Sequence, residues 1–192
     1  MITVLFLPTD TPARPMQEAV MEHIAKKYGQ NADAVKKSLA AYEALARLYD
    51  DFCRQRGKPC TSLPSVTYTE EGRPFFSDCS LSFSLSHTEG MAAAVLSDGG
   101  RVGIDIERAR PDKETLHRRL FEKKFFEEER RLWGADTFED AFLKIWTTKE
   151  AVAKATDQPI LSVNTAKLPR GLALWQGKAL SGATFSLAAE RA

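Results

Sequence analysis

Two short segments of this sequence carry charged side chains at spacings that suit metal-assisted chemistry. The first, 102–107, reads Val-Gly-Ile-Asp-Ile-Glu. Side chains alternate between the faces of a strand, so Asp105 and Glu107 share one face, with backbones about 6.5–7 Å apart. Oxygen donors placed in this way bind a hard divalent cation, and Gly103 on the same face leaves room for a ligand. Taken alone, the pattern also describes a solvated polar face of an edge strand.

The second segment, 146–154, places Trp146, Glu150 and Lys154 on one helical stripe at i, i+4 and i+8. The carboxylate supplies a further oxygen donor, and the ammonium suits a group that develops negative charge. The plain alternative is a surface Glu–Lys pair beside a core tryptophan, which would contribute only a few tenths of a kcal/mol.

The elements that position these segments follow from hydrophobic periodicity. A β-branched apolar run and period-2 alternation indicate strands, and apolar positions three and four apart indicate helices. Short glycine-containing turns separate the three strands before residue 107, which predicts an antiparallel meander. The fold class is α+β, with two similar-sized halves that meet near residue 100. The expected strands are 2–7, 81–86, 91–96, 101–107, 172–175 and 185–188, and the expected helices are 15–28, 32–56, 113–133 and 137–157.

Composition narrows the class of function. The 192 residues contain 27 Lys and Arg against 26 Asp and Glu, a formal net charge of +1. This balance gives no general attraction to nucleic acid or to a membrane surface. Three cysteines without a C-x-x-C pair predict reduced thiols rather than a metal site. The N-terminal apolar run is too short for a signal peptide or a membrane span, so we expect a cytoplasmic protein.

Five ordered motifs together resemble the 4′-phosphopantetheinyl transferase family. Residues 103–107 resemble its G-[IV]-D-[IV]-E signature, and 146–154 resemble W-x-x-K-E-x-x-x-K. Residues 83–88, Phe-Ser-Leu-Ser-His-Thr, resemble F-N-[IL]-S-H-[ST] with serine in place of the usual asparagine. Residues 71–74 resemble a G-[KR]-P turn, and 33–39 resemble a helix start where many members carry Arg-[ST]-Leu. Five motifs in order are far more specific than any one of them.

The resemblance carries an expectation for the fold. The length and the N-terminal motifs resemble the longer, surfactin-synthetase-activating type, a monomer of two fused and similarly folded halves. Each half is expected to be an antiparallel sheet packed with helices. Residues 1–100 would form the N-terminal half with the coenzyme A contacts, and residues 101–192 the C-terminal half with the metal site and the carrier-protein docking surface.

The resemblance also implies an activity and its residues. Such enzymes transfer the 4′-phosphopantetheine group of coenzyme A to a serine of an apo acyl or peptidyl carrier protein and release adenosine 3′,5′-bisphosphate. A Mg²⁺ ion would be held by Asp105, Glu107 and Glu150, of which Glu150 also belongs to the catalytic set. Lys154 would neutralise charge on the pyrophosphate. Lys149, beside Glu150, is either a further participant or a solvated lysine.

Coenzyme A contacts are implied at four further positions. Ser86 and His87 would contact its phosphates, with His87 on the 3′-phosphate. Arg73 and Lys37 would make further phosphate and adenine-side contacts. Lys37 stands where the family often has Arg, so it binds phosphate without a bidentate fork, and Lys36 is an alternative for this role.

For the general base and for the surface that would bind the carrier protein, the sequence leaves alternatives open. The family's F-x-x-x-E spacing, counted from Phe125, falls on Glu129, whereas counting from Phe126 falls on Arg130. We take Glu129 as the base; the alternative is that the acidic run only forms a first helical turn, where negative charge is favourable. Carrier proteins are acidic, so the complementary surface is expected to be basic and apolar. One candidate combines Arg118, Arg119, Lys123 and Lys124 with Leu116, Leu120 and Phe121, and a solvated amphipathic helix is the alternative.

Two other functions fit parts of the pattern. A Mg²⁺-dependent phosphohydrolase or nuclease would use the same three carboxylates, although it gives no reason for the serine–histidine strand. A non-catalytic module that binds coenzyme A or a carrier protein is disfavoured because all three carboxylates and Lys154 are present.

Overall fold

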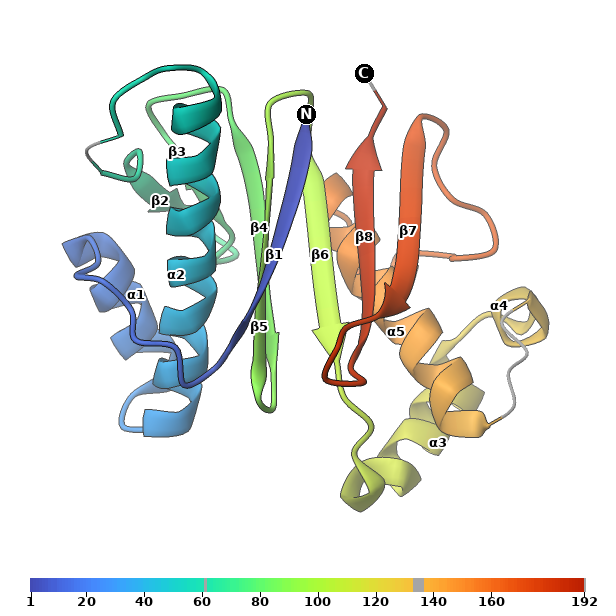
Figure 1. The fold of residues 1–192 in the computed structure, drawn as a ribbon. Coiled ribbons are helices and arrows are strands. Elements are labelled where there is room, and N and C mark those ends of the chain that lie inside the picture. Colours follow the sequence, from blue (N-terminus) through green and yellow to red (C-terminus); the bar gives the residue numbers. More distant parts are fainter. Residues whose placement is uncertain (61, 133–136, 192) are drawn as a thin grey trace. The chain divides into compact units, whose positions relative to one another are not determined.

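The structure, a computed structural model, describes residues 1–60, 62–132 and 137–191. It divides into two compact units, Met1–Arg101 and Val102–Arg191. Each unit contains a three-stranded antiparallel sheet and a long helix against it (Figure 1). The expected α+β class is therefore confirmed.

In the first unit, a three-stranded sheet has the order β1-β5-β4, and β2 pairs with β3 in a separate hairpin. The elements are β1 (Ile2–Pro8), α1 (Glu18–Tyr28), α2 (Ala32–Gln55), β2 (Val66–Tyr68), β3 (Pro74–Phe76), β4 (Ser82–Thr88) and β5 (Met91–Ser97).

Helix α2 begins where the sequence predicts. The Asn31 side chain accepts a hydrogen bond from the backbone N–H of Ala34 at 3.1 Å, which satisfies one of the donors left open at a helix start. The helix then packs on the sheet through small residues, with Ala40 and Ala41 against Ala92, all nearly or fully buried. Small side chains on both elements let the helix and sheet backbones approach closely.

The second unit repeats this plan, with a sheet of order β6-β8-β7. Helix α5 (Phe138–Thr156) lies against one face of this sheet, and the Thr137 side chain caps it by accepting from the N–H of Asp140 at 3.1 Å (Figure 1). The other elements are β6 (Val102–Glu107), the 3-10 turns Pro111–Lys113 and Ile160–Ser162, α3 (Glu114–Lys124), α4 (Glu127–Leu132), β7 (Leu172–Lys178) and β8 (Thr184–Glu190).

The two units share one topology. In each, a first strand is followed by helices, and a hairpin ends the unit; the first unit has the additional β2–β3 hairpin before it. The first strand pairs with the second strand of the final hairpin. These pairs are β1 with β5 in the first unit and β6 with β8 in the second, both antiparallel.

Two sequence predictions about connectivity are wrong. Strand β6 does not continue a meander from β4 and β5, because it pairs with β8. The expected helix 113–133 is split into α3 and α4 by extended backbone at Phe125 (φ −92°, ψ 144°). Phe125 is buried among aromatic rings there, and this tertiary contact overrides the local helical pattern.

The expectation of three reduced cysteines is also wrong. Cys53, near the end of α2, is joined to Cys60 by a disulfide with a Cα–Cα distance of 5.8 Å, and Cys79 is a free, exposed thiol. No C-x-x-C spacing signals this disulfide, because the two cysteines are seven residues apart and meet only where the chain reverses after α2. Over the residues that are described, no helix is long and apolar enough to cross a membrane.

Candidate functional site

Helix α5 lies directly on β6, and Gly103 makes this approach possible. A Cβ atom at Gly103 would lie 2.0 Å from the carbonyl oxygen of Ala151 and 2.7 Å from the amide nitrogen of Ala155. Helix backbone therefore fills the space that the sequence interpretation left for a ligand, and that detail is wrong. The close approach brings the polar side chains of α5 within reach of Asp105.

Lys154 joins the two acidic segments of the second unit. Its ammonium Nζ lies 2.9 Å from Asp105 Oδ1 and 3.6 Å from Glu150 Oε2, and it donates to the carbonyl oxygen of Ile104 at 3.0 Å. Asp105 is only 2% exposed, whereas the side chains of Glu150 and Lys154 are 21% and 30% exposed. The two carboxylates and the lysine thus form one cluster. Solvent contacts it at the two side chains of α5, whereas Asp105 is buried.

The charged groups of this cluster shift one another's pKa values. Burial, with the charge of Asp105 and a hydrogen bond to it, raises the pKa of Glu150 to about 7, and Glu107 adds to this. For Lys154, burial lowers the pKa, but attraction to Asp105 and Glu150 outweighs it and the pKa is raised overall. Near neutral pH the Glu150 carboxyl is therefore only partly ionised, because negative charge beside it disfavours its ionised form.

The donor chemistry of the cluster fits a hard divalent cation. Asp105, Glu107 and Glu150 offer only oxygen ligands, which Mg²⁺ prefers, and their mutual repulsion is what a cation would relieve. As the described side chains stand, no three His, Cys, Asp or Glu residues lie close enough together to hold a metal ion. The ammonium of Lys154 lies between Asp105 and Glu150 instead.

Glu129, the predicted base, is not exposed at all in this structure. Its carboxylate pairs with Lys149 Nζ at 2.8 Å and accepts from the backbone N–H of Phe126 at 2.8 Å and of Thr165 at 2.6 Å. The contact with Phe126 is the helix-start arrangement in which a glutamate in the first turn of α4 reaches back to the preceding N–H. A carboxylate enclosed in this way reaches a substrate only after the ion pair opens. The alternative that Lys149 is a solvated lysine is wrong, because its side chain is fully buried.

Two of the predicted coenzyme A contacts lie in helices and turns of the first unit. Lys37 forms an i, i+4 ion pair with Asp33 at 2.5 Å on α2, and Lys36 is exposed. Arg73 is half-buried in the β2–β3 turn, where its backbone N–H donates to Thr69 Oγ1 at 3.2 Å. Gly72, at φ 82°, supplies the left-handed conformation that this turn needs.

The other two contacts lie on β4, and neighbouring residues of a strand point to opposite faces. Ser86 is buried at 8% exposure, whereas His87 is half-buried. His87 Nε2 lies 3.3 Å from the hydroxyl oxygen of Tyr28, the last residue of α1. The sequence interpretation missed Tyr28, and no motif in the chain indicates it.

A further aromatic contact ties α1 to the turn that carries Arg73. The imidazole of His23 stacks on Tyr68 with ring centroids 3.8 Å apart and planes within 5°. The Cε1 atom of His23 lies 3.4 Å from the position of a Cβ on Gly72. Helix α1 therefore contacts both the β2–β3 turn and the end of β4.

A sequence model of the 4′-phosphopantetheinyl transferase superfamily matches residues 101–175, most of the second unit and all of its acidic cluster. The second unit is therefore similar to this superfamily. The chain is 39% identical over 121 residues to 4′-phosphopantetheinyl transferase AcpT of Salmonella typhimurium. This match covers 59% of the chain and 62% of the relative. The chain is 32% identical over 107 residues to 4′-phosphopantetheinyl transferase HetI of a Nostoc species, covering 53% and 45%. The chain thus spans less than two thirds of these relatives.

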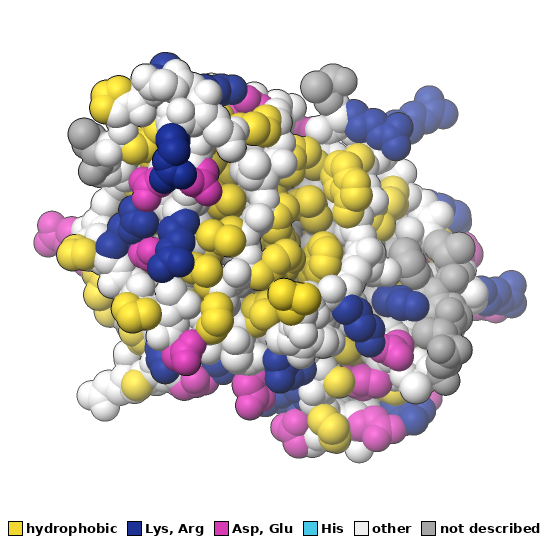
Figure 2. Space-filling model, in the orientation of Figure 1, with side chains coloured by type: hydrophobic (Ala, Val, Ile, Leu, Met, Phe, Trp, Pro, Cys, Tyr) yellow, Lys and Arg dark blue, Asp and Glu magenta, His cyan; other side chains and the backbone are white. Residues whose placement is uncertain are grey.

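The surface predicted to receive a carrier protein lies on α3 and is mixed in charge. Leu116 is 51% exposed, and Leu120 and Phe121 pack partly buried on the aromatic cluster behind it. Arg118 pairs with Glu114 at 2.7 Å and lies over the ring of Phe138. Figure 2 shows acidic side chains among the basic ones over this helix. Only part of the basic charge on α3 is therefore available to an acidic partner.

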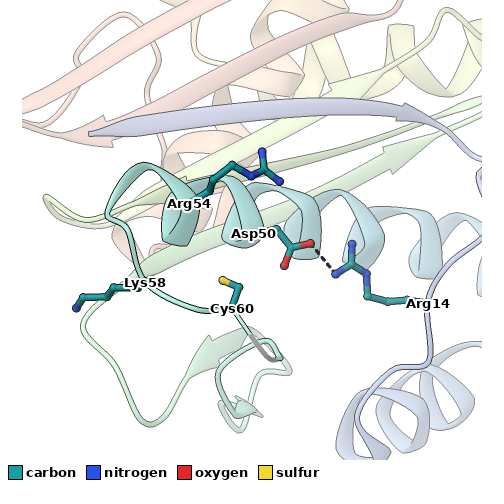
Figure 3. Close-up of a pocket in the computed structure, with 5 residues that line it drawn as sticks. All are labelled: Arg14, Asp50, Arg54, Lys58 and Cys60. Atoms are coloured by element: carbon teal, nitrogen blue, oxygen red, sulfur yellow. Dashed lines mark hydrogen bonds and ion pairs between the residues drawn. The ribbon is translucent and has the colours of Figure 1, made fainter.

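A hollow of about 440 Å³ in the first unit is lined by none of the predicted site residues. Its lining side chains do not converge (Figure 3). Arg14 is held by Asp50 at 2.8 Å, while Lys58 points away from that pair. We assign no ligand to it. The lining residues are Arg14, Asp50, Arg54, Lys58 and Cys60.

Proposed function

We propose that this chain transfers the 4′-phosphopantetheine group of coenzyme A to a serine hydroxyl of an apo acyl or peptidyl carrier protein. The serine oxygen forms a new bond to the pantetheine-side phosphorus of the pyrophosphate. The bond from that phosphorus to the bridging oxygen breaks, and adenosine 3′,5′-bisphosphate leaves with the bridging oxygen. The serine proton passes to a base.

One observation carries the proposal. Lys154 lies between Asp105 and Glu150, in the unit that matches the transferase superfamily. Displacement at phosphorus needs reactants held in place and negative charge stabilised, with little covalent chemistry from the protein. A lysine held by carboxylates, and partly exposed, is suited to pair with a pyrophosphate oxygen.

Asp105, Glu107 and Glu150 would hold Mg²⁺ in this proposal. The ion, when bound, would neutralise the pyrophosphate and stabilise charge on the leaving oxygen. The chain's own part is to fix these carboxylates. Gly103 lets α5 rest on β6, so Glu150 and Lys154 are held beside Asp105 by backbone packing.

The first unit would bind the remainder of coenzyme A. His87 and Ser86 are proposed to contact its phosphates, His87 the 3′-phosphate, and Arg73 and Lys37 to contact phosphate and the adenine side. Lys37 is held by Asp33, so it would have to exchange that ion pair for the ligand. The exposed Lys36 remains the alternative.

Glu129 stays our prediction for the base, and it requires the ion pair with Lys149 to open. The carrier protein is predicted to dock on α3, where Leu116 is exposed beside Arg119, Lys123 and Lys124. A monomeric state and a cytoplasmic location also stay predictions.

The test is intact-protein mass spectrometry of apo carrier proteins incubated with this chain, coenzyme A and Mg²⁺. A mass gain of one phosphopantetheine group, lost on addition of a chelator, supports the reaction, the metal and the partner together. A chain that binds coenzyme A but modifies neither fatty-acid nor peptide-type carriers would be a binding module. Release of inorganic phosphate or nucleotides would instead identify a hydrolase.

A further inference from the structure

Tyr28 contacts a predicted ligand-binding histidine from another element. Its hydroxyl oxygen lies 3.3 Å from Nε2 of His87, and the two rings are 6.1 Å apart at 56°. The contact joins the end of α1 to β4, fifty-nine residues further along the chain. It is an edge contact made through the hydroxyl rather than a stacked pair of rings.

The phenol is held firmly enough to direct the imidazole. Helix α1 is anchored by Val20 and Ile24, each 2% exposed, and Tyr28 itself packs against the same core cluster. The helix ends immediately after it, where the N–H of Gly29 donates to the carbonyl oxygen of Ala25 at 2.8 Å. The Lys27 ammonium lies 5.2 Å from the centroid of the Tyr28 ring, which places one positive charge next to the tyrosine.

A hydrogen bond at one ring nitrogen determines what the other nitrogen presents. When the hydroxyl donates to Nε2 of neutral His87, the ring proton is on Nδ1, which becomes a donor. When the imidazole is protonated, the hydroxyl accepts from Nε2 and Nδ1 is again a donor. A neutral ring with its proton on Nε2 would instead donate to the hydroxyl oxygen and leave Nδ1 an acceptor. A phosphate at Nδ1 needs a donor there, and in both states that provide one the Tyr28 hydroxyl can serve as the partner of Nε2.

We propose that Tyr28 is a positioning residue for binding of the coenzyme A 3′-phosphate and acts by fixing the orientation of His87 and by serving as the hydrogen-bond partner of its Nε2 when Nδ1 donates to the phosphate. This inference rests on the proposed function, because it takes the contact between His87 and coenzyme A from there. Tyr28 itself need not touch the ligand. A purely structural role, in which the hydroxyl only fastens α1 to β4, is the competing explanation.

The decisive variant is Tyr28→Phe, which retains the ring and its packing and removes only the hydroxyl. Calorimetry would measure binding of coenzyme A and of 3′-dephospho-coenzyme A without a carrier protein. We expect binding of coenzyme A to weaken about three- to tenfold, the scale of one lost hydrogen bond, and binding of the dephospho form to stay unchanged. In transfer assays KM for coenzyme A should rise by the same factor while kcat stays constant.

Two controls separate positioning from structure. Tyr49→Phe removes the hydroxyl of another half-buried tyrosine of the first unit and should leave both binding constants unchanged. In a double-mutant cycle, Tyr28→Phe should have no further effect once His87→Ala is present. The chain has only three histidines, so nitrogen-15 spectra can assign the His87 ring and should show its tautomer balance shift in Tyr28→Phe.

The outcomes are distinguishable. Equal weakening of both ligands, or additive effects with His87→Ala, would show a structural role and overturn the inference. Unchanged binding in a folded Tyr28→Phe protein would also overturn it. A wild-type chain that binds coenzyme A but transfers nothing overturns the proposed function alone, whereas one that binds no coenzyme A overturns both.

Discussion

The ammonium of Lys149 and the carboxylate of Glu129 form a 2.8 Å ion pair in the second unit, and neither side chain has any exposed surface. Lys149 Nζ also donates to the carbonyl oxygen of Val163, and it lies 4.9 Å from the ring centroid of Phe126. The pair therefore ties α5 to the start of α4 and to the segment that follows α5. Burial of two charges costs a large desolvation free energy, which the pair and its backbone hydrogen bonds must offset.

Removal of either partner alone should destabilise the protein strongly. We expect Glu129→Gln and Lys149→Met each to lower the free energy of unfolding by about 3–5 kcal/mol, because each leaves one buried charge uncompensated. The double variant should recover much of this loss. Urea denaturation of the two single variants and the double variant measures these free energies of unfolding.

The same double variant tests Glu129 as a base. If Glu129 takes the serine proton, a folded double variant should lose roughly 10²–10⁴-fold in kcat, the usual contribution of a general base. Near-wild-type turnover would assign the pair to the structure of the fold and remove Glu129 from the mechanism.

Gly103→Ala should disrupt the contact between β6 and α5. The new Cβ would meet helix backbone at 2.0 and 2.7 Å, and backbone cannot rotate away as a flexible side chain can. We expect the free energy of unfolding to fall by about 1–3 kcal/mol or more, and transfer to be lost as Lys154 moves from Asp105. Gly99→Ala is the matched control, since a Cβ there meets nothing within 4 Å. Wild-type stability of the Gly103→Ala protein would contradict the close contact between the α5 backbone and Gly103 of β6.

Asp105→Asn should abolish Mg²⁺-dependent transfer and keep the fold. The substitution preserves the size of a side chain that is 2% exposed, and it removes one negative charge from the cluster. A loss of roughly 10²–10³ in transfer rate is expected from removal of one such electrostatic group. Mg²⁺ should raise the melting temperature of the wild type but not of the variant, because only the wild type binds the ion. Asp112→Asn, an exposed acid of the same unit, should behave as wild type.

Glu43 should give the first unit an acid-sensitive contribution to stability. Burial raises the pKa of Glu43, but hydrogen bonds from Arg14 and Arg47 outweigh it and the pKa falls below its ordinary value of 4.5. The folded state therefore binds this proton less tightly than the unfolded state. The contribution is complete above a pH of about 4.5 and is lost as the pH falls through the lowered pKa.

Urea denaturation between about pH 6 and pH 3 tests this sign. The wild type should lose more free energy of unfolding across that range than Glu43→Gln, which cannot ionise. Asp51→Asn, on an exposed carboxylate of the same helix, should retain the wild-type slope. Identical slopes for wild type and Glu43→Gln would contradict the lowered pKa.

The sequence by itself determined most of the longer helices and strands and the acidic and basic residues within them. The strand Val102–Glu107, the helix Phe138–Thr156 and the cap at Asn31 follow from period-2 alternation, helical spacing and a local side-chain hydrogen bond. These signals involve neighbours in the chain, so they are readable without the fold. The i, i+4 placement of Glu150 and Lys154 is local in the same sense.

The tertiary structure alone decided which segments meet. Strand β6 pairs with β8 rather than with the strand before it, Lys149 is buried on Glu129, and Tyr28 reaches His87. Each of these contacts joins residues distant in the chain, and nothing in the local pattern of either partner specifies the other. Burial likewise depends on what packs above a residue, which is why Gly103 was expected to leave space and instead lies against helix backbone.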